Sequence, residues 1–140
     1  MQEMLEDNAY SVSNSVRAAL DFLKAIERGD AVSVQRAYAT GAVQTEWPNA
    51  LKPKGDRRDL AQMAADFERG KKLLSRQRYE VGNVTAQLNR VVLEVKWTGV
   101  LAVDLGELKA GDKMVCRSAI CFDFKDGRIV AQRNYDCFES

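Results

Sequence analysis

The sequence predicts one α+β domain, in which three helices and a short strand precede a four-stranded antiparallel sheet. Up to Gly70 the apolar residues recur at intervals of three and four, and beyond it they alternate with polar residues to the end of the chain. The Asp126-Gly127 pair between the last two alternating runs is typical of a two-residue hairpin turn. A chain of 140 residues suits one domain with its own core. The helices are therefore expected to pack together on one face of the sheet.

The first helix is predicted to begin at Ser15 and to end near Gly29. Its apolar stripe consists of Val16, Ala19, Leu20, Leu23 and Ile26. Residues 1–14 are polar and show no clear period, so they are predicted to form a flexible N-terminal arm. The domain itself is then expected to occupy residues 15–140.

Two shorter helices and one strand are predicted next. Asp30 is a suitable N-cap for the second helix, which is expected to end at Gly41. The apolar side of this helix consists of Val34, Ala37 and Tyr38. A short strand at 42–47 leads into a loop at 48–55 that contains two prolines and a glycine. A third helix is predicted at 56–68, with Gly70 as its stop.

The rest of the chain is predicted to form four long strands. They occupy residues 76–86, 91–101, 113–125 and 128–138, with a longer tip at 102–112. In the last strand, alternation assigns to one face Val130, Gln132, Asn134 and Asp136. It assigns to the opposite face Ile129, Ala131, Arg133 and Tyr135.

Composition excludes several classes of function. The 21 basic and 20 acidic residues give a net charge of +1, so no global field draws the protein to nucleic acid or to an anionic membrane. The chain contains no histidine, which excludes Ser-His-Asp triads, Cys-His dyads and histidine metal sites. We therefore expect no metal and no cofactor, and any chemistry is assigned to carboxylates, amides, hydroxyls, lysines, arginines or thiols.

The cysteines indicate a reducing compartment. Cys116, Cys121 and Cys137 contain no C-x-x-C pair, and Cys116 and Cys121 point to opposite faces of one predicted strand. We interpret them as packing thiols in a cytoplasmic protein. The sequence shows no membrane-spanning run and no secretory signal.

Four short motifs, taken in order, resemble the SnoaL-like branch of the nuclear transport factor 2-like superfamily. They are Ala25 to Asp30, Glu46-Trp47-Pro48, Trp97-Thr98-Gly99, and Phe122 to Ile129 running into Arg133 to Asp136. The resemblance implies a cone-shaped, curved antiparallel sheet wrapped around the long N-terminal helix. It also implies an apolar pocket inside the cone and a homodimer formed through the outer face of the sheet. Members include ketosteroid isomerases, limonene epoxide hydrolases, polyketide cyclases and dehydratases.

Asp136 is the candidate general acid or base, because a carboxylate partly buried at the mouth of the cone can move a proton without histidine. The epoxide hydrolases carry a catalytic aspartate where this chain has Asn134. An amide cannot deprotonate water, so the epoxide hydrolase mechanism is not expected, and Asn134 is left to orient an oxygen. The alternative for Asp136 is a solvated carboxylate at the strand end, paired with an arginine.

Glu46 is the second catalytic candidate. Ketosteroid isomerases place a proton-shuttling carboxylate directly before the proline that ends the first strand, and this chain has Trp47 there. In a regular strand Glu46 points to the face opposite Trp47, whereas a bulge would exchange the two. The alternative for Glu46 is a surface charge or a charge in a dimer interface.

The predicted ligand-binding residues combine apolar rings with a few polar groups, as small-molecule pockets do. They are Tyr38, Trp47, Met63, Phe67 and Trp97, together with Gln132 and Asn134 on the last strand. The alternative is that the aromatic members only fill the core.

The leading hypothesis is a protein that binds a small apolar organic molecule and acts as a cofactor-free isomerase, dehydratase or cyclase. The alternative is a non-catalytic, dimeric ligand carrier or protein-interaction module. In both, an apolar strip on the outer face of the sheet is expected to form a homodimer. This strip consists of Ala119, Cys121, Ile129, Ala131 and Tyr135.

Overall fold

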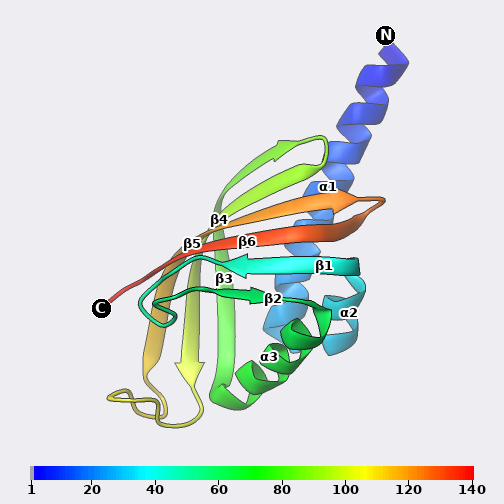
Figure 1. Cartoon of the computed structure of the whole chain (residues 1–140). Coiled ribbons are helices and arrows are strands. Elements are labelled where there is room, and N and C mark those ends of the chain that lie inside the picture. Colours follow the sequence, from blue (N-terminus) through cyan, green and yellow to red (C-terminus); the bar gives the residue numbers. More distant parts are fainter. Residues whose placement is uncertain (1) are drawn as a thin grey trace.

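The computed structural model describes residues 2–140, with side chains from residue 11 onward, and shows a curved sheet with three helices against one face (Figure 1). The helices are α1 (Gln2–Arg28), α2 (Ala31–Arg36) and α3 (Leu60–Leu73). The strands are β1 (Tyr38–Glu46), β2 (Asp56–Arg58), β3 (Leu74–Gln87), β4 (Arg90–Leu101), β5 (Lys113–Lys125) and β6 (Arg128–Phe138). The predicted α+β class is confirmed.

The six strands form one mixed sheet in the order β2-β1-β6-β5-β4-β3. Strands β3 to β6 form the predicted antiparallel meander. Strand β1 pairs in parallel with β6, which places Gln44 beside Gln132 and Glu46 beside Asn134. This parallel pair brings a segment from the helical half of the chain against the C-terminal strand.

Helix α1 begins at Gln2, which is earlier than the predicted start at Ser15. Residues 2–14 contain neither proline nor glycine and are rich in helix-forming residues, so nothing in them stops the helix. The flexibility of residues 1–14 stays a prediction. No helix in residues 2–140 combines the length and the apolar character that crossing a membrane requires.

Strand β1 begins earlier than predicted, because α2 ends at Arg36 and Tyr38 already belongs to the strand. Gly41 lies inside β1 with a φ of 80°, and the pairing with β6 shifts between Tyr38 and Val43. Such a bulge changes which residues face the core. Beyond it Glu46 lies on the side of the sheet that carries the helices, with a side chain only 13% exposed.

Helix α3 begins later than predicted, at Leu60, because Asp59 caps it. The Asp59 carboxylate accepts a hydrogen bond from the backbone N–H of Gln62, and the Gln62 side chain accepts one from the backbone N–H of Asp59. Residues 56–58, which were predicted to be helical, instead form strand β2 against β1. The helix also continues through Gly70 to Leu73.

The β5–β6 hairpin has the predicted bounds, and its turn residues Asp126 and Gly127 both have positive φ angles, 52° and 79°. One assignment of face in β6 is wrong. The register shifts between Asp123 and Phe124, so Ile129 is fully buried in the core rather than exposed on the outer face with Ala131.

Aromatic packing seats α1 on the inner face of the sheet. Phe22 of α1 contacts the Tyr38 ring edge-on at 5.3 Å between centroids and the Phe122 ring at 5.7 Å. Phe122 and Leu93 are completely buried beneath the helix. This core fixes α1 across the strands that line the interior.

We predict that Asp59→Ala lowers the free energy of unfolding by about 1 kcal/mol, because the substitution removes both hydrogen bonds of the capping box. Urea denaturation monitored by circular dichroism measures the change. Glu107→Ala, at an exposed residue of the 102–112 tip, is the control and should change stability far less. Equal stability of the two variants would contradict the assigned cap.

Candidate functional site

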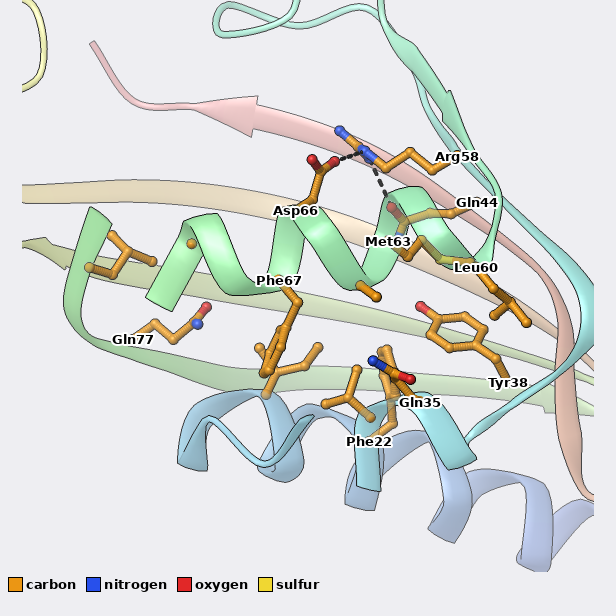
Figure 2. Close-up of a pocket in the computed structure, with 15 residues that line it drawn as sticks. Phe22, Gln35, Tyr38, Gln44, Arg58, Leu60, Met63, Asp66, Phe67 and Gln77 are labelled. Atoms are coloured by element: carbon orange, nitrogen blue, oxygen red, sulfur yellow. Dashed lines mark hydrogen bonds and ion pairs between the residues drawn. The ribbon is translucent and has the colours of Figure 1, made fainter. Parts of the chain in front are cut away.

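The interior holds a main cavity of about 330 Å³ between α1, α3, β1 and β3 (Figure 2). Most of its wall is apolar and comes from Phe22, Ile26, Leu60, Met63, Phe67 and Leu74. The polar part of the wall comes from Gln35, Tyr38, Gln44, Arg58, Asp66 and Gln77. A mostly apolar enclosure with a few polar groups suits a small organic ligand.

Arg58 occupies the polar end of the main cavity, and its side chain is only 9% exposed. Its guanidinium donates to Gln44 Oε1 at 2.8 Å and to Glu46 Oε1 at 2.7 Å. It also forms an ion pair with Asp66 of α3, which Figure 2 marks by a dashed line. Arg58 therefore ties β1, β2 and α3 together at one wall of the cavity.

The charges around Arg58 balance. Its carboxylate partners are Glu46, Asp56 and Asp66. Lys52 pairs with Asp56 at 3.2 Å, and Arg69 pairs with Asp66. Three cations thus oppose three carboxylates, and the polar end of the cavity presents no net charge to a ligand.

A second cavity of about 200 Å³ lies against the inner face of strands β3 to β6. Tyr79, Trp97, Cys116 and Phe138 form one row across these four strands, because each is the register partner of the next. Asp136 joins this wall from β6. A carboxylate thus borders a space lined by aromatic rings and polar side chains.

Ser118 lies directly opposite Asp136 in the β5–β6 pairing, and its hydroxyl donates to Asp136 Oδ1 at 2.5 Å. Burial raises the pKa of Asp136, and the nearby negative charge of Glu46 raises it further. The Ser118 hydrogen bond and the positive charge of Arg58 act in the opposite direction, yet the pKa stays above its ordinary value. The pKa of Asp136 is therefore displaced in the direction expected of a proton-transferring carboxyl group.

Side-chain hydrogen bonds link the two cavities. The Tyr38 hydroxyl donates to Gln132 Oε1 at 2.5 Å, and Gln132 Nε2 donates to Asn134 Oδ1 at 3.0 Å. Burial raises the pKa of Tyr38, so the phenol keeps its proton and its role as donor. Tyr38 lines the main cavity and Asn134 lines the second, with the buried Gln132 between them.

The structure divides the predicted site residues between these two places. Tyr38, Met63 and Phe67 line the main cavity. Trp97, Asn134 and Asp136 line the second. Gln132 connects the two groups, and Glu46 lies beside them as a partner of Arg58.

Trp47 lines neither cavity. It is 45% exposed, and its ring lies 6.1 Å from the ring of Tyr135, which is also exposed. The bulge at Gly41 accounts for this difference, since it turns Glu46 toward the interior and leaves the next residue on the outer face.

The sequence analysis did not name five residues that line the two cavities or contact their walls. The alternation pattern of the strands could have identified some of them but not others. They are Arg58, Asp66, Gln77, Tyr79 and Ser118. Gln77 and Tyr79 alternate with exposed residues along β3, and Ser118 follows Cys116 by two residues along β5. The alternation of a strand therefore predicts that Gln77 and Tyr79 share one face, and that Ser118 shares a face with Cys116. Arg58 lies in a three-residue strand, which is too short to show any period.

The chain belongs to the SnoaL-like domain family, whose profile matches residues 19–132. This assignment confirms the resemblance to SnoaL-like and nuclear transport factor 2-like proteins. No curated protein matches the chain significantly.

Solved structures share the cone-shaped fold at low sequence identity. A candidate polyketide cyclase from Xanthomonas campestris pv. campestris has a TM-score of 0.76 and 23% identity, over 89% of this chain and 91% of that one. An LEH-like epoxide hydrolase from M. tuberculosis has a TM-score of 0.69 and 19% identity, over 91% and 84%. An NTF2-like protein from Burkholderia xenovorans LB400 has a TM-score of 0.68 and 18% identity, over 89% and 90%. These similarities show the fold, and the chemistry has to be argued from the cavities.

We predict that the stability difference between wild type and Asp136→Asn depends on pH. The folded chain holds the Asp136 proton to higher pH than the unfolded chain, so wild-type stability falls as pH rises through the interval between the two pKa values. The variant lacks this contribution, so its stability relative to wild type should increase as the pH rises above about 4, the ordinary pKa of an aspartate. Urea denaturation across this range measures the difference.

Asp21→Asn is the control, because Asp21 is exposed on α1. Its stability should follow that of wild type at every pH. Parallel curves for wild type and Asp136→Asn would show that Asp136 titrates as an ordinary solvated carboxylate.

Proposed function

We propose that this SnoaL-like protein binds a small, uncharged, largely apolar organic molecule and carries out cofactor-free acid–base chemistry on it. Asp136 is the proposed proton-transfer group. The observation that carries the proposal is its carboxylate, which lines an interior cavity, accepts a hydrogen bond from Ser118 and has a raised pKa. The reaction class is isomerisation, dehydration or cyclisation, each of which needs a proton moved and no redox group.

The main cavity supports an apolar and uncharged ligand. Its wall is mostly aliphatic and aromatic, and the charges around Arg58 already compensate one another. A charged ligand group there would be desolvated without gaining an opposite charge, which is unfavourable. The similarity to a candidate polyketide cyclase supports a ring-containing ligand of this kind.

The second candidate function is a ligand carrier that performs no chemistry. Asn134 favours it, because this amide stands where the sequence resemblance places a catalytic aspartate of the epoxide hydrolases. Asn134 accepts a hydrogen bond from Gln132 and can orient a ligand oxygen without transferring a proton. Both functions use the same cavities, and only a turnover measurement separates them.

We predict that Asp136→Asn retains ligand binding but lowers turnover by about 100-fold or more, which is the usual contribution of a general base. Asparagine keeps the size of the side chain and can still meet Ser118, so the cavity should persist. Binding is measured by thermal shift with hydrophobic ring compounds, and turnover by product formation from the compounds that bind.

Asp21→Asn is the control and should have wild-type turnover. Full activity of Asp136→Asn would exclude Asp136 as the proton-transfer group and would make Glu46→Gln the next variant to test. Full binding with no turnover of any bound compound by wild type would favour the carrier.

The outer face of the sheet supports a proposed homodimer. Trp47 and Tyr135 are exposed there by 45% and 46%. A groove beside Tyr135 is also lined by Ala119 and Cys137. Exposed apolar surface of this kind is typical of an interface between subunits.

We predict that light scattering at tens of micromolar protein gives the mass of a dimer, and that Tyr135→Lys shifts it toward the monomer. The lysine would bring two like charges close together in a two-fold interface. Val103→Lys, at an exposed position in the 102–112 tip, is the control and should leave the dimer intact. A monomer mass for wild type would overturn the proposal.

We also propose the cytoplasm as the location of the protein. Cys116, Cys121 and Cys137 are all free thiols, as expected in a reducing compartment.

A further inference from the structure

One residue, Gln77 of β3, lines both the main cavity and the second cavity. In Figure 2 its side chain extends from β3 toward the end of the main cavity that contains Phe67. The Asp136 carboxylate lies on the wall of the other cavity. A ligand whose body fills the main cavity therefore meets Gln77 at the boundary with the space around Asp136.

The amide of Gln77 is held by Trp97, whose indole Nε1 donates to Gln77 Oε1 at 2.9 Å. The Trp97 ring is itself fixed on β4. It contacts Phe138 edge-on at 6.4 Å between centroids, and it lies so close over Gly99 that a Cβ at that position would overlap the ring. The absence of a side chain at Gly99 thus allows the indole to lean along the strand toward Gln77.

This contact decides which end of the amide is left for a ligand. Indole N–H is only a donor, so the group that faces it has to be the amide oxygen. Gln77 Nε2 then points away from Trp97, and it forms no hydrogen bond to any side chain or backbone group in the part of the chain that the structure describes. An oriented donor with no protein partner remains at the boundary of the two cavities.

We propose that Gln77 is a specificity-determining residue, whose Nε2 donates a hydrogen bond to a carbonyl or hydroxyl oxygen of the ligand at the boundary between the two cavities. The inference rests on the proposed function and specifies its ligand. The ligand is a neutral ring ketone or alcohol, with an apolar body in the main cavity and its oxygen turned toward the Asp136 cavity.

The two cavities select different parts of such a molecule. The apolar wall of the main cavity takes the ring body, and its compensated charges select against an ionised group. The Gln77 donor selects an oxygen acceptor at the end of that body. The oxygen-bearing carbon is then the part of the ligand closest to the cavity of Asp136, where a proton transfer would act on it.

The test compares two probes of similar shape, 4-phenylcyclohexanone and its parent hydrocarbon phenylcyclohexane, by isothermal titration calorimetry. Gln77→Leu removes the donor while keeping most of the side-chain volume. We expect it to weaken ketone binding by about 3- to 10-fold, the range of one net hydrogen bond, and to leave hydrocarbon binding within about twofold. Circular dichroism and melting temperature check that the variant is folded.

Gln87→Leu is the matched control, since Gln87 is the exposed last residue of the same strand β3 and lines neither cavity. It should leave the binding of both probes unchanged. A second readout uses Trp47→Phe, which leaves Trp97 as the only tryptophan of the chain. The ketone should then change the emission of Trp97.

The outcomes separate this inference from the proposed function. Equal affinity of wild type and Gln77→Leu for the ketone, or an equal loss for both probes, overturns the role of Gln77 and leaves ligand binding intact. Binding of the ketone without any change in Trp97 emission also overturns it, because the oxygen would not reach the boundary. Failure of both probes to bind wild type contradicts the proposed function and the inference together.

Discussion

The buried guanidinium of Arg58 is the constraint on which the interior of this protein depends. A cation with 91% of its side chain buried has to be neutralised and hydrogen-bonded where it lies, or the fold carries an uncompensated charge. Gln44 and Glu46 meet it from β1, and Asp66 meets it from α3. Removing one partner from a buried pair of this kind typically lowers the free energy of unfolding by about 3–5 kcal/mol. Separating β1 or α3 from Arg58 is therefore strongly unfavourable. The wall of the main cavity is therefore held by charge as well as by apolar packing.

The same cluster reaches the proposed reaction group. Glu46 raises the pKa of Asp136 and Arg58 lowers it, so the charge balance around the guanidinium influences a carboxylate in the neighbouring cavity. The hydrogen bonds from Tyr38 through Gln132 to Asn134 join the two cavities by a second route. The spaces proposed for ligand binding and for proton transfer are thus adjacent and share an electrostatic environment.

The residues that line the cavities restrict the possible reactions more than membership of the SnoaL-like family does. SnoaL-like and nuclear transport factor 2-like folds are shared by proteins that bear different names, among them a candidate polyketide cyclase and an epoxide hydrolase. Asn134 argues against activation of water, because an amide has no proton-accepting role at neutral pH. Asp136 lines the second cavity, and its proposed role suits reactions that move a proton within the ligand. The proposed hydrogen bond from Gln77 requires an oxygen atom on the ligand, which neither the fold nor the family specifies.

Local patterns in the sequence determined much of the architecture. The change of period after Gly70 identified the sheet, the Asp126-Gly127 turn fixed the last hairpin, and alternation in β6 placed Gln132, Asn134 and Asp136 on the inner face. The tertiary structure alone decided the parallel pairing of β1 with β6, the register shifts in β1 and in the β5–β6 hairpin, and the positions of the two cavities. A period reports only which neighbours along the chain share a face. It carries no information about an arginine in a three-residue strand, or about a register shift that is set by a partner strand far away in the sequence.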